Sequence, residues 1–213
     1  MLRSAQVAML CLSGALLASA FLPALALEVS VTNLVTDDQA AHAATIVDPD
    51  LKNPWGMSFS PTSPFWVSNN GSGTSTLYTV NPVTQVPTKA ALTVTIPGIG
   101  SVTGQVFNPG TGFNGDRFLF VSEDGTISGW RGALGTTAEV LATGSSQNVY
   151  KGAAFGDIGV DSYLYAANFR SGSIDVIKGS TLAPDLSGTF VDPNLPAGFA
   201  PFNIQNLGGT LFV

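Results

Sequence analysis

Three oxygen-bearing side chains recur at one position of a repeated sequence pattern. Asn69, Glu123 and Asn168 each stand at the end of a short apolar segment with the composition of a β-strand. Carboxylate and amide oxygens are ligands for hard cations such as Ca²⁺, so these residues are candidate metal ligands. The alternative is that they cap turns, because asparagine tolerates the left-handed region and bonds its own backbone. Glu123 is the single carboxylate among them, which makes the coordination sparse.

A second set of polar residues stands just before the first strand of each copy of the pattern. It consists of Asn53, Ser101, Lys151 and Asn203. We expect both sets at the rim of one face, because loops there are free to vary while the strands are fixed by packing. That face is the predicted binding surface.

The chain offers little for nucleophilic or histidine-based catalysis. His42 is its only histidine, and the Gly-x-Ser-x-Gly motif of a nucleophile elbow is absent. Cys11, the only cysteine, lies in an N-terminal segment that is expected to be removed, which excludes disulfides and thiolate metal sites from the mature chain. We expect His42 on the surface and predict no catalytic residue, which favours a non-enzymatic protein.

The elements that would position these residues come from an internal repeat. Gly56, Gly104 and Gly152 are spaced by 48 residues, and Asn203 follows 51 residues later. Each copy contains a small-residue strand, an apolar strand and a third strand introduced by a glycine turn. Weaker fourth strands are expected at residues 91–96, 138–142 and 188–191. A period of about 40 to 50 residues with several short strands is typical of the blades of a β-propeller.

The predicted fold is therefore all-β, a β-propeller of four-stranded blades. Residues 27–213 would form one domain, with blades near 53–100, 101–148, 149–199 and an incomplete one at 200–213. A complete ring would have about six blades, so this chain would hold about three and a half of them. The segment 27–38 is expected to be a strand that completes the last blade. A β-sandwich is the alternative, but it does not predict similar strand triplets every 48 residues.

Large aromatic residues recur at matched strand positions of the repeats. This favours packing between neighbouring blades over a carbohydrate-stacking surface. The residues are Trp55, Phe59, Trp66, Phe107, Phe120, Phe155, Tyr165 and Phe202. Trp130 and Arg131 end a third strand and are expected to be more exposed, as candidates for partner contacts.

The first residues indicate export. Arg3 precedes an apolar stretch over residues 7–22, and Ala24-Leu25-Ala26 supplies the small-x-small pattern of a cleavage site, so residues 1–26 are predicted to be a signal peptide. An uncleaved anchor is the alternative, but the stretch is short for a bilayer span of about 20 residues. We expect a periplasmic or extracellular protein with no membrane span after cleavage.

The composition favours a folded protein and argues against nucleic acid binding. With 45% hydrophobic and 10% charged residues, the chain favours a packed core over disorder. A net charge of -6 argues against nucleic acid as a partner, because an acidic surface repels phosphate.

Three stretches are specific enough to compare with known families. They are Asn53-Pro54-Trp55-Gly56-Met57-Ser58-Phe59 with the following Pro64-Phe65-Trp66-Val67, Tyr163-Leu164-Tyr165-Ala166-Ala167-Asn168-Phe169, and the run over residues 190–206. They resemble a family of uncharacterised exported bacterial propeller proteins of NHL- or lactonase-like type, some of which end in a PEP-CTERM sorting tail. The resemblance implies the fold and export. Because the family has no established reaction, it implies no catalytic residue.

Two functions follow as expectations. The first is a binding module of the cell envelope or extracellular space that takes a small molecule, a glycan or a protein at one face of the propeller. The alternative is a Ca²⁺-dependent lactonase or hydrolase that uses Asn69, Glu123 and Asn168, since calcium-dependent propeller lactonases use such a ring of oxygen ligands. No cofactor other than Ca²⁺ is expected in either case.

Overall fold

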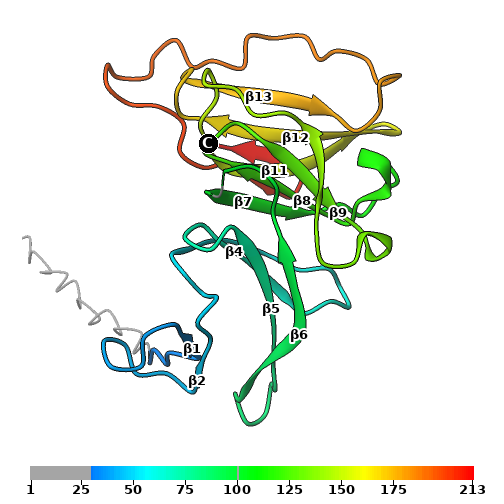
Figure 1. Cartoon of the computed structure of the whole chain (residues 1–213). Coiled ribbons are helices and arrows are strands. Elements are labelled where there is room, and N and C mark those ends of the chain that lie inside the picture. The colour runs from blue at the N-terminus through cyan, green and yellow to red at the C-terminus, as the bar shows by residue number, and fades with distance from the viewer. Residues whose placement is uncertain (1–29, 100) are drawn as a thin grey trace, which may run out of the picture. The chain divides into compact units, whose positions relative to one another are not determined.

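The structure, a computed structural model, describes residues 30–99 and 101–213 (Figure 1). Strands dominate it, and the helical elements of the described part are two 3-10 turns at Phe113–Gly115 and Gly132–Leu134. The predicted all-β class is confirmed. The predicted signal peptide, residues 1–26, lies outside the described residues.

The first repeat forms a four-stranded antiparallel sheet in which chain order is also spatial order. Its strands are β3 (Pro54–Ser58), β4 (Phe65–Asn69), β5 (Thr74–Val80) and β6 (Pro87–Thr95). The turn between β4 and β5 ends at Gly73 with φ 64°, a left-handed conformation that glycine adopts without strain. Tight turns of this kind keep consecutive strands adjacent, so a local sequence pattern becomes a sheet.

The second repeat builds a sheet of the same order. Its strands are β7 (Val102–Phe107), β8 (Phe118–Ser122), β9 (Ile127–Trp130) and β10 (Glu139–Ala142). The fourth strands expected at residues 91–96 and 138–142 are therefore confirmed as β6 and β10 within a few residues. Four-stranded antiparallel sheets thus recur along the chain, as the repeat predicts.

The third repeat differs from the prediction in its outer part. Its sheet has three strands, β11 (Tyr150–Ile158), β12 (Asp161–Asn168) and β13 (Ser173–Lys178). The fourth strand expected at residues 188–191 is wrong, because Gly188 has φ 130° and Phe190 has φ 49°, which break an extended backbone. A hydrogen bond of 2.9 Å from the backbone of Ile174 to Phe190 O connects this segment to β13.

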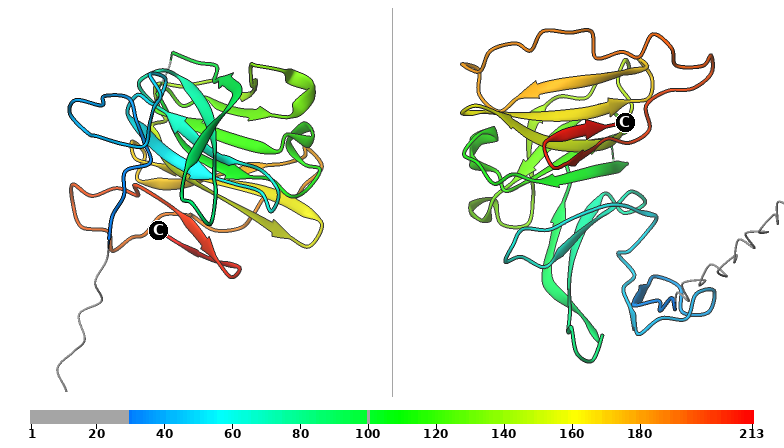
Figure 2. Two further views of the ribbon diagram at one scale, coloured as in Figure 1. Left: turned by 90° about the horizontal axis from the view of Figure 1, so that it is seen from below. Right: turned by 180° about the vertical axis from the view of Figure 1, so that it is seen from behind.

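The fourth repeat begins with a hairpin of β14 (Gln205–Leu207) and β15 (Thr210–Phe212), and β14 lies beside β11 (Figure 2). The first strand of this repeat, β14, starts two residues after Asn203, the position that corresponds to the repeat glycines inside β3, β7 and β11. The reason is local: Asn203 Oδ1 accepts a hydrogen bond of 2.8 Å from Ile204 N, and such side-chain bonds compete with a strand ladder.

The first strands of successive sheets, β3, β7 and β11, lie side by side. The repeat glycines permit this approach: a Cβ added at Gly56 would lie 2.5 Å from Thr103 O, and one added at Gly104 would lie 2.7 Å from Ala153 N. A Cβ at Gly152 would collide with Asn203. The 48-residue spacing therefore marks equivalent backbone contacts between sheets. The described sheets do not close into a ring, and the propeller stays a prediction.

Hydrophobic cores fill the space between successive sheets. On β8, Phe118 and Phe120 belong to the core shared with β4–β6, whereas Leu119 and Val121 belong to the core shared with β11 and β12. Successive side chains of a strand point to opposite faces, so a strand between two cores is apolar at each position. This explains the unbroken apolar run of β8.

The N-terminal segment is fastened to the first sheet by a buried carboxylate. Asp48 follows β2 (Ile46–Val47), which pairs in parallel with β1 (Val35–Thr36). The fully buried Asp48 carboxylate accepts hydrogen bonds from the Tyr78 hydroxyl and, at 2.6 Å, from Lys89 Nζ. These bonds tie the segment before the first sheet to β5 and β6.

The strand expected over residues 27–38 is wrong in extent. Within the described part of this segment, the strand is limited to Val35–Thr36. The apolar residues Val29, Val31 and Leu34 are the pattern that predicts this strand, but Val31 is 83% exposed. An apolar pattern over a few residues does not by itself bury a side chain, and no neighbouring described strand covers Val31.

Candidate functional site

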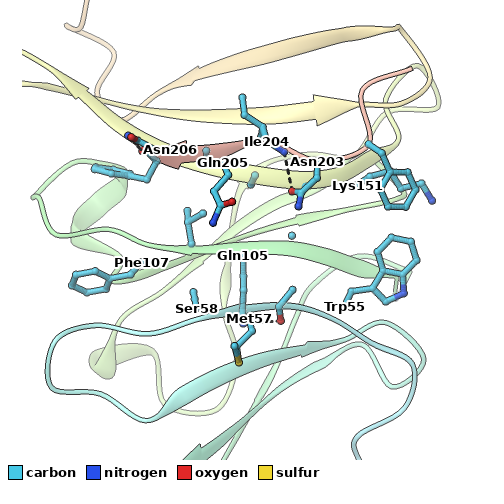
Figure 3. A pocket seen from close by; sticks show the side chains of 18 of the residues that line it. Trp55, Met57, Ser58, Gln105, Phe107, Lys151, Asn203, Ile204, Gln205 and Asn206 are labelled. Carbon is cyan, nitrogen blue, oxygen red and sulfur yellow. Dashed lines mark hydrogen bonds between the residues drawn. The ribbon is translucent and has the colours of Figure 1, made fainter. Parts of the chain in front are cut away.

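An open groove runs along β3, β7, β11 and the segment that leads into β14 (Figure 3). Its volume is about 630 Å³, within the range of roughly 300–1,000 Å³ that is usual for small-molecule sites. The repeat glycines Gly56, Gly104 and Gly152 line it. Because they carry no side chain, the first strands approach one another closely at these positions, and backbone forms part of the groove wall. Lys151 is the one charged residue among the described residues that line the groove.

Lys151 lies at one end of the groove, beside Trp55 (Figure 3). Its Nζ donates to the carboxylate of Glu123 and lies 5.0 Å from the centroid of the Trp55 ring. The centroids of the Phe169 and Phe202 rings are 5.8 and 5.9 Å from the same nitrogen. A cation within about 6 Å of an aromatic ring is attracted by its quadrupole. We call Lys151, Glu123 and these three rings the Lys151 site.

The rings of the Lys151 site contact one another and reach solvent. Trp55 and Phe202 stack with centroids 5.8 Å apart, and Phe169 meets Phe202 edge-on at 6.0 Å. Their exposed fractions are 36% for Trp55, 43% for Phe169 and 53% for Phe202. The rings come from the first repeat, the end of β12 and the start of the fourth repeat, so the fold rather than a local motif gathers them.

A chain of hydrogen bonds extends the Lys151 site to the first repeat. Asn70 Nδ2 donates to Glu123 Oε2 at 3.1 Å, and Asn53 Nδ2 donates to Asn70 Oδ1 at 3.1 Å. Burial opposes ionisation of Glu123, but the hydrogen bonds from Lys151 and Asn70 outweigh it and hold the pKa of this carboxyl below its usual value. The Lys151–Glu123 pair therefore carries balanced charges at neutral pH.

Of the three predicted metal ligands, Glu123 alone belongs to the Lys151 site. Asn69 is fully buried in its own sheet, where its Nδ2 donates to Thr76 Oγ1 at 2.9 Å. Asn168 Oδ1 accepts backbone N–H groups of Arg170 and Ser171 at 3.2 and 3.3 Å. That is the geometry of a turn cap. The three side chains are thus bound to three different sets of partners.

Several of the polar residues predicted just before the first strands lie at the Lys151 site or in the groove. Lys151 reaches Glu123, and Asn53 is linked to it through Asn70. Asn203 lines the same groove. Sequence reasoning placed both sets at one rim but did not pair the lysine of one set with the carboxylate of the other. The opposite charges of Glu123 and Lys151 at adjoining repeat positions are the signal that could have predicted the pair.

The expected burial of the matched aromatic residues is confirmed for some and wrong for others. Trp66 and Phe120 are 2% and 0% exposed within the core between the first two sheets. In contrast, Trp55, Phe59 and Phe202 are 36%, 58% and 53% exposed. Matched positions in the repeat do not guarantee matched neighbours, because burial depends on which sheet lies opposite.

Trp130 and Arg131, which were predicted to be more exposed and to contact a partner, make contacts within the protein. The Trp130 ring lies 4.8 Å from that of Trp66. Arg131 Nη1 bonds Asp116 Oδ1 at 2.8 Å and Glu139 Oε1 at 2.7 Å. Burial raises the pKa of the Asp116 carboxyl to about 6 despite the hydrogen bond from Arg131. Both residues are half-buried, and partner contacts through them stay a prediction.

Other chemistry is sparse in the described part of the chain. Over residues 30–99 and 101–213, no group of three or more His, Cys, Asp or Glu residues is placed to hold a metal ion. His42 is exposed, as predicted. In the same residues, no helix has both the length and the apolar character needed to cross a bilayer.

These features define a class: an all-β protein of stacked antiparallel sheets with a groove along their first strands. No family model matches the chain. An uncharacterised protein of Acanthamoeba polyphaga mimivirus is 29% identical to it over 199 residues. That match covers 83% of this chain and 45% of the viral protein, so the chain spans less than half the length of this relative.

Proposed function

We propose that the protein is an exported, non-catalytic β-propeller that binds a ligand in the groove beside the Lys151 site. The observation that carries this proposal is the gathering of Trp55, Phe169 and Phe202, from three different repeats, around Lys151 at the end of an open groove. Exposed apolar clusters on soluble proteins are costly, and larger ones usually mark contact sites. A groove with pre-formed walls is the usual place for such a site.

The propeller architecture is part of this proposal. Successive sheets pack face to face, and their first strands meet at the repeat glycines. The outer face of the β3–β6 sheet, which includes Phe65, Val67 and Val80, lines an apolar hollow of about 540 Å³. In a ring of about six blades this face would pack against another blade, which removes both the apolar surface and the exposed edges. The resemblance to exported bacterial propellers supports the same arrangement.

Export and its consequences belong to the proposal as well. Signal peptidase would cleave after Ala26 and release a protein that begins at Leu27, in the periplasm or outside the cell. Mass spectrometry of the secreted protein tests this directly. A mature N-terminus other than Leu27, or retention of residues 1–26, would contradict the predicted cleavage.

A Ca²⁺-dependent lactonase is the second candidate function. One observation favours it: Asn69 Oδ1 is buried and has no hydrogen-bond partner among the described residues, so it is an oxygen atom that a cation would satisfy. Against it, Glu123 is already paired with Lys151, and a cation would have to displace the ammonium group. The binding module therefore explains more of the geometry.

Thermal melting distinguishes the two functions. A ligand that binds the native state raises the melting temperature. We expect a panel of saccharides, peptides and small acids to contain a ligand that raises it for the wild type and for Phe199→Ala, but not for Phe169→Ala. Phe199 is a matched control, since it is 71% exposed, does not line the groove and, unlike Phe169, is not part of the Lys151 site. A shift with millimolar Ca²⁺ that Glu123→Gln abolishes, together with lactone hydrolysis, would refute the binding module in favour of the enzyme.

A further inference from the structure

We propose that the groove takes a short, uncharged oligosaccharide, an inference that rests on the proposed binding function and names its ligand class. The proposal comes from three properties of the groove: its charge balance, its exposed aromatic rings and its exposed amide groups.

The charge balance excludes most ionic ligands. Lys151, the charged residue of the groove lining, is neutralised by Glu123 through a direct ion pair. A charged ligand would lose water without gaining an opposite charge, which is costly. The protein carries a net charge of -6, which repels acidic polymers at long range.

Aromatic surface is available at both ends of the groove. At the Lys151 end the stacked pair of Trp55 and Phe202 is partly exposed. Further along the lining, Phe59 is 58% exposed. Figure 3 places Phe107 at the end opposite Trp55, where its ring is half-buried and lies 4.9 Å from the Arg117 guanidinium. Aromatic rings offer flat apolar area with little conformational entropy to lose. The C–H face of a pyranose ring is flat and apolar in the same way, and it can stack on such a ring.

Between these rings the groove presents neutral polar groups. The side chains of Gln205 and Asn203 are exposed in the lining (Figure 3), and the Asn203 bond to Ile204 uses only Oδ1. Amides both donate and accept, so they suit sugar hydroxyls, which do the same. Leaving such groups unpaired beside a bound ligand would cost free energy, so the ligand must carry hydrogen-bonding groups along its length, as the hydroxyls of an oligosaccharide do.

Isothermal titration of the full chain with defined probes tests the inference. The neutral probes are cellotetraose, maltotetraose and mannotetraose. Tetragalacturonate is the acidic probe of similar size, and a blocked Gly-Gln-Gly-Gln peptide is the neutral peptide probe. We expect one or more neutral tetrasaccharides to bind with a dissociation constant below about 1 mM.

Substitutions locate the binding. We expect Phe202→Ala to weaken binding about tenfold and Gln205→Ala about threefold, while Phe199→Ala leaves it unchanged. Both substituted side chains are exposed, so the variants should fold, and circular dichroism verifies this. Binding that Phe202→Ala leaves intact would overturn the inference.

The outcomes also separate this inference from the function on which it rests. If only the peptide or tetragalacturonate binds, and Phe202→Ala abolishes that binding, the oligosaccharide inference is wrong while the binding function stands. If none of the probes binds, the inference is wrong, and the melting panel with Phe169→Ala decides the binding function separately.

Discussion

Replacing Gly104 by alanine tests the contact on which the stacking of the sheets depends. The added Cβ would lie 2.7 Å from Ala153 N and 2.9 Å from Gly152 Cα, whereas ordinary contacts begin at 3.4 Å. The strands β7 and β11 would have to separate by about 0.7 Å, the difference between these values. Both partners are backbone atoms, so no change of rotamer can relieve the overlap.

The expected loss follows from two opposing effects. Overpacking of this kind costs about 3 kcal/mol, the upper end of the usual range. Alanine also restricts the unfolded chain relative to glycine, which returns about 0.4–1 kcal/mol. We therefore expect Gly104→Ala to lower the free energy of unfolding by about 2 kcal/mol.

Urea denaturation followed by tryptophan fluorescence measures this change. With a denaturant slope of about 2–3 kcal/mol per M, the midpoint should fall by about 0.7–1 M. Gly132→Ala is the matched control, because a Cβ there meets nothing within 4 Å, and its midpoint should stay or rise slightly. Equal midpoints for the two variants would refute the proposed contact between the first strands.

Three further predictions concern burial and charge. Phe120→Ala should lower the free energy of unfolding by about 3–5 kcal/mol, because Phe120 is 0% exposed. Phe202→Ala should lower it by less than about 1 kcal/mol, because Phe202 is 53% exposed. Equal losses in chemical denaturation would contradict this difference in burial. Asp48→Asn should cost about 3 kcal/mol at pH 7, because the buried carboxylate is paired with Lys89. Burial opposes the charge of Asp48, but the hydrogen bonds from Lys89 and the Tyr78 hydroxyl outweigh it and hold the pKa of Asp48 below its usual value. The stabilisation by this carboxylate is therefore lost as the pH falls below about 4, where the wild type and Asp48→Asn should have similar stabilities. Melting curves from pH 7 to 3 check this. Asp116 should have the opposite pH dependence. Burial raises its pKa to about 6, so the native state holds the proton more tightly than the unfolded chain. The free energy of unfolding should therefore fall by up to about 3 kcal/mol as the pH rises from about 4 to 6. The same pH dependence in Asp116→Asn would assign it to another group.

The repeat explains why much of the fold was predictable. Glycines spaced by 48 residues mark the strands that meet between sheets, and the turn glycines mark where each hairpin reverses. The fourth strand of the third repeat failed because a left-handed residue such as Phe190 is not recognisable in a strand-like sequence. Its conformation is set by its surroundings rather than by its own preference.

The candidate site was predictable only in part. Glu123 and Lys151 were each expected at the rim of one face, yet their pairing joins residues 28 positions apart, and Asn70 contributes from 53 positions before Glu123. The metal interpretation assumed that equivalent positions point to a common centre. In the structure, Asn69 donates to Thr76 of its own sheet, and Asn168 caps the turn that follows it.

The amino-acid sequence by itself determined the strand pattern, the period of the repeat and the glycines at its contacts, because these depend on residue size and on spacing along the chain. The tertiary structure alone decided which aromatic residues are buried: Trp66 lies between two sheets, whereas Trp55 lies at the mouth of the groove. It also decided that Lys151 stands among three rings and beside a carboxylate. Such arrangements depend on which distant segments lie opposite one another, and a residue's own type does not contain that information.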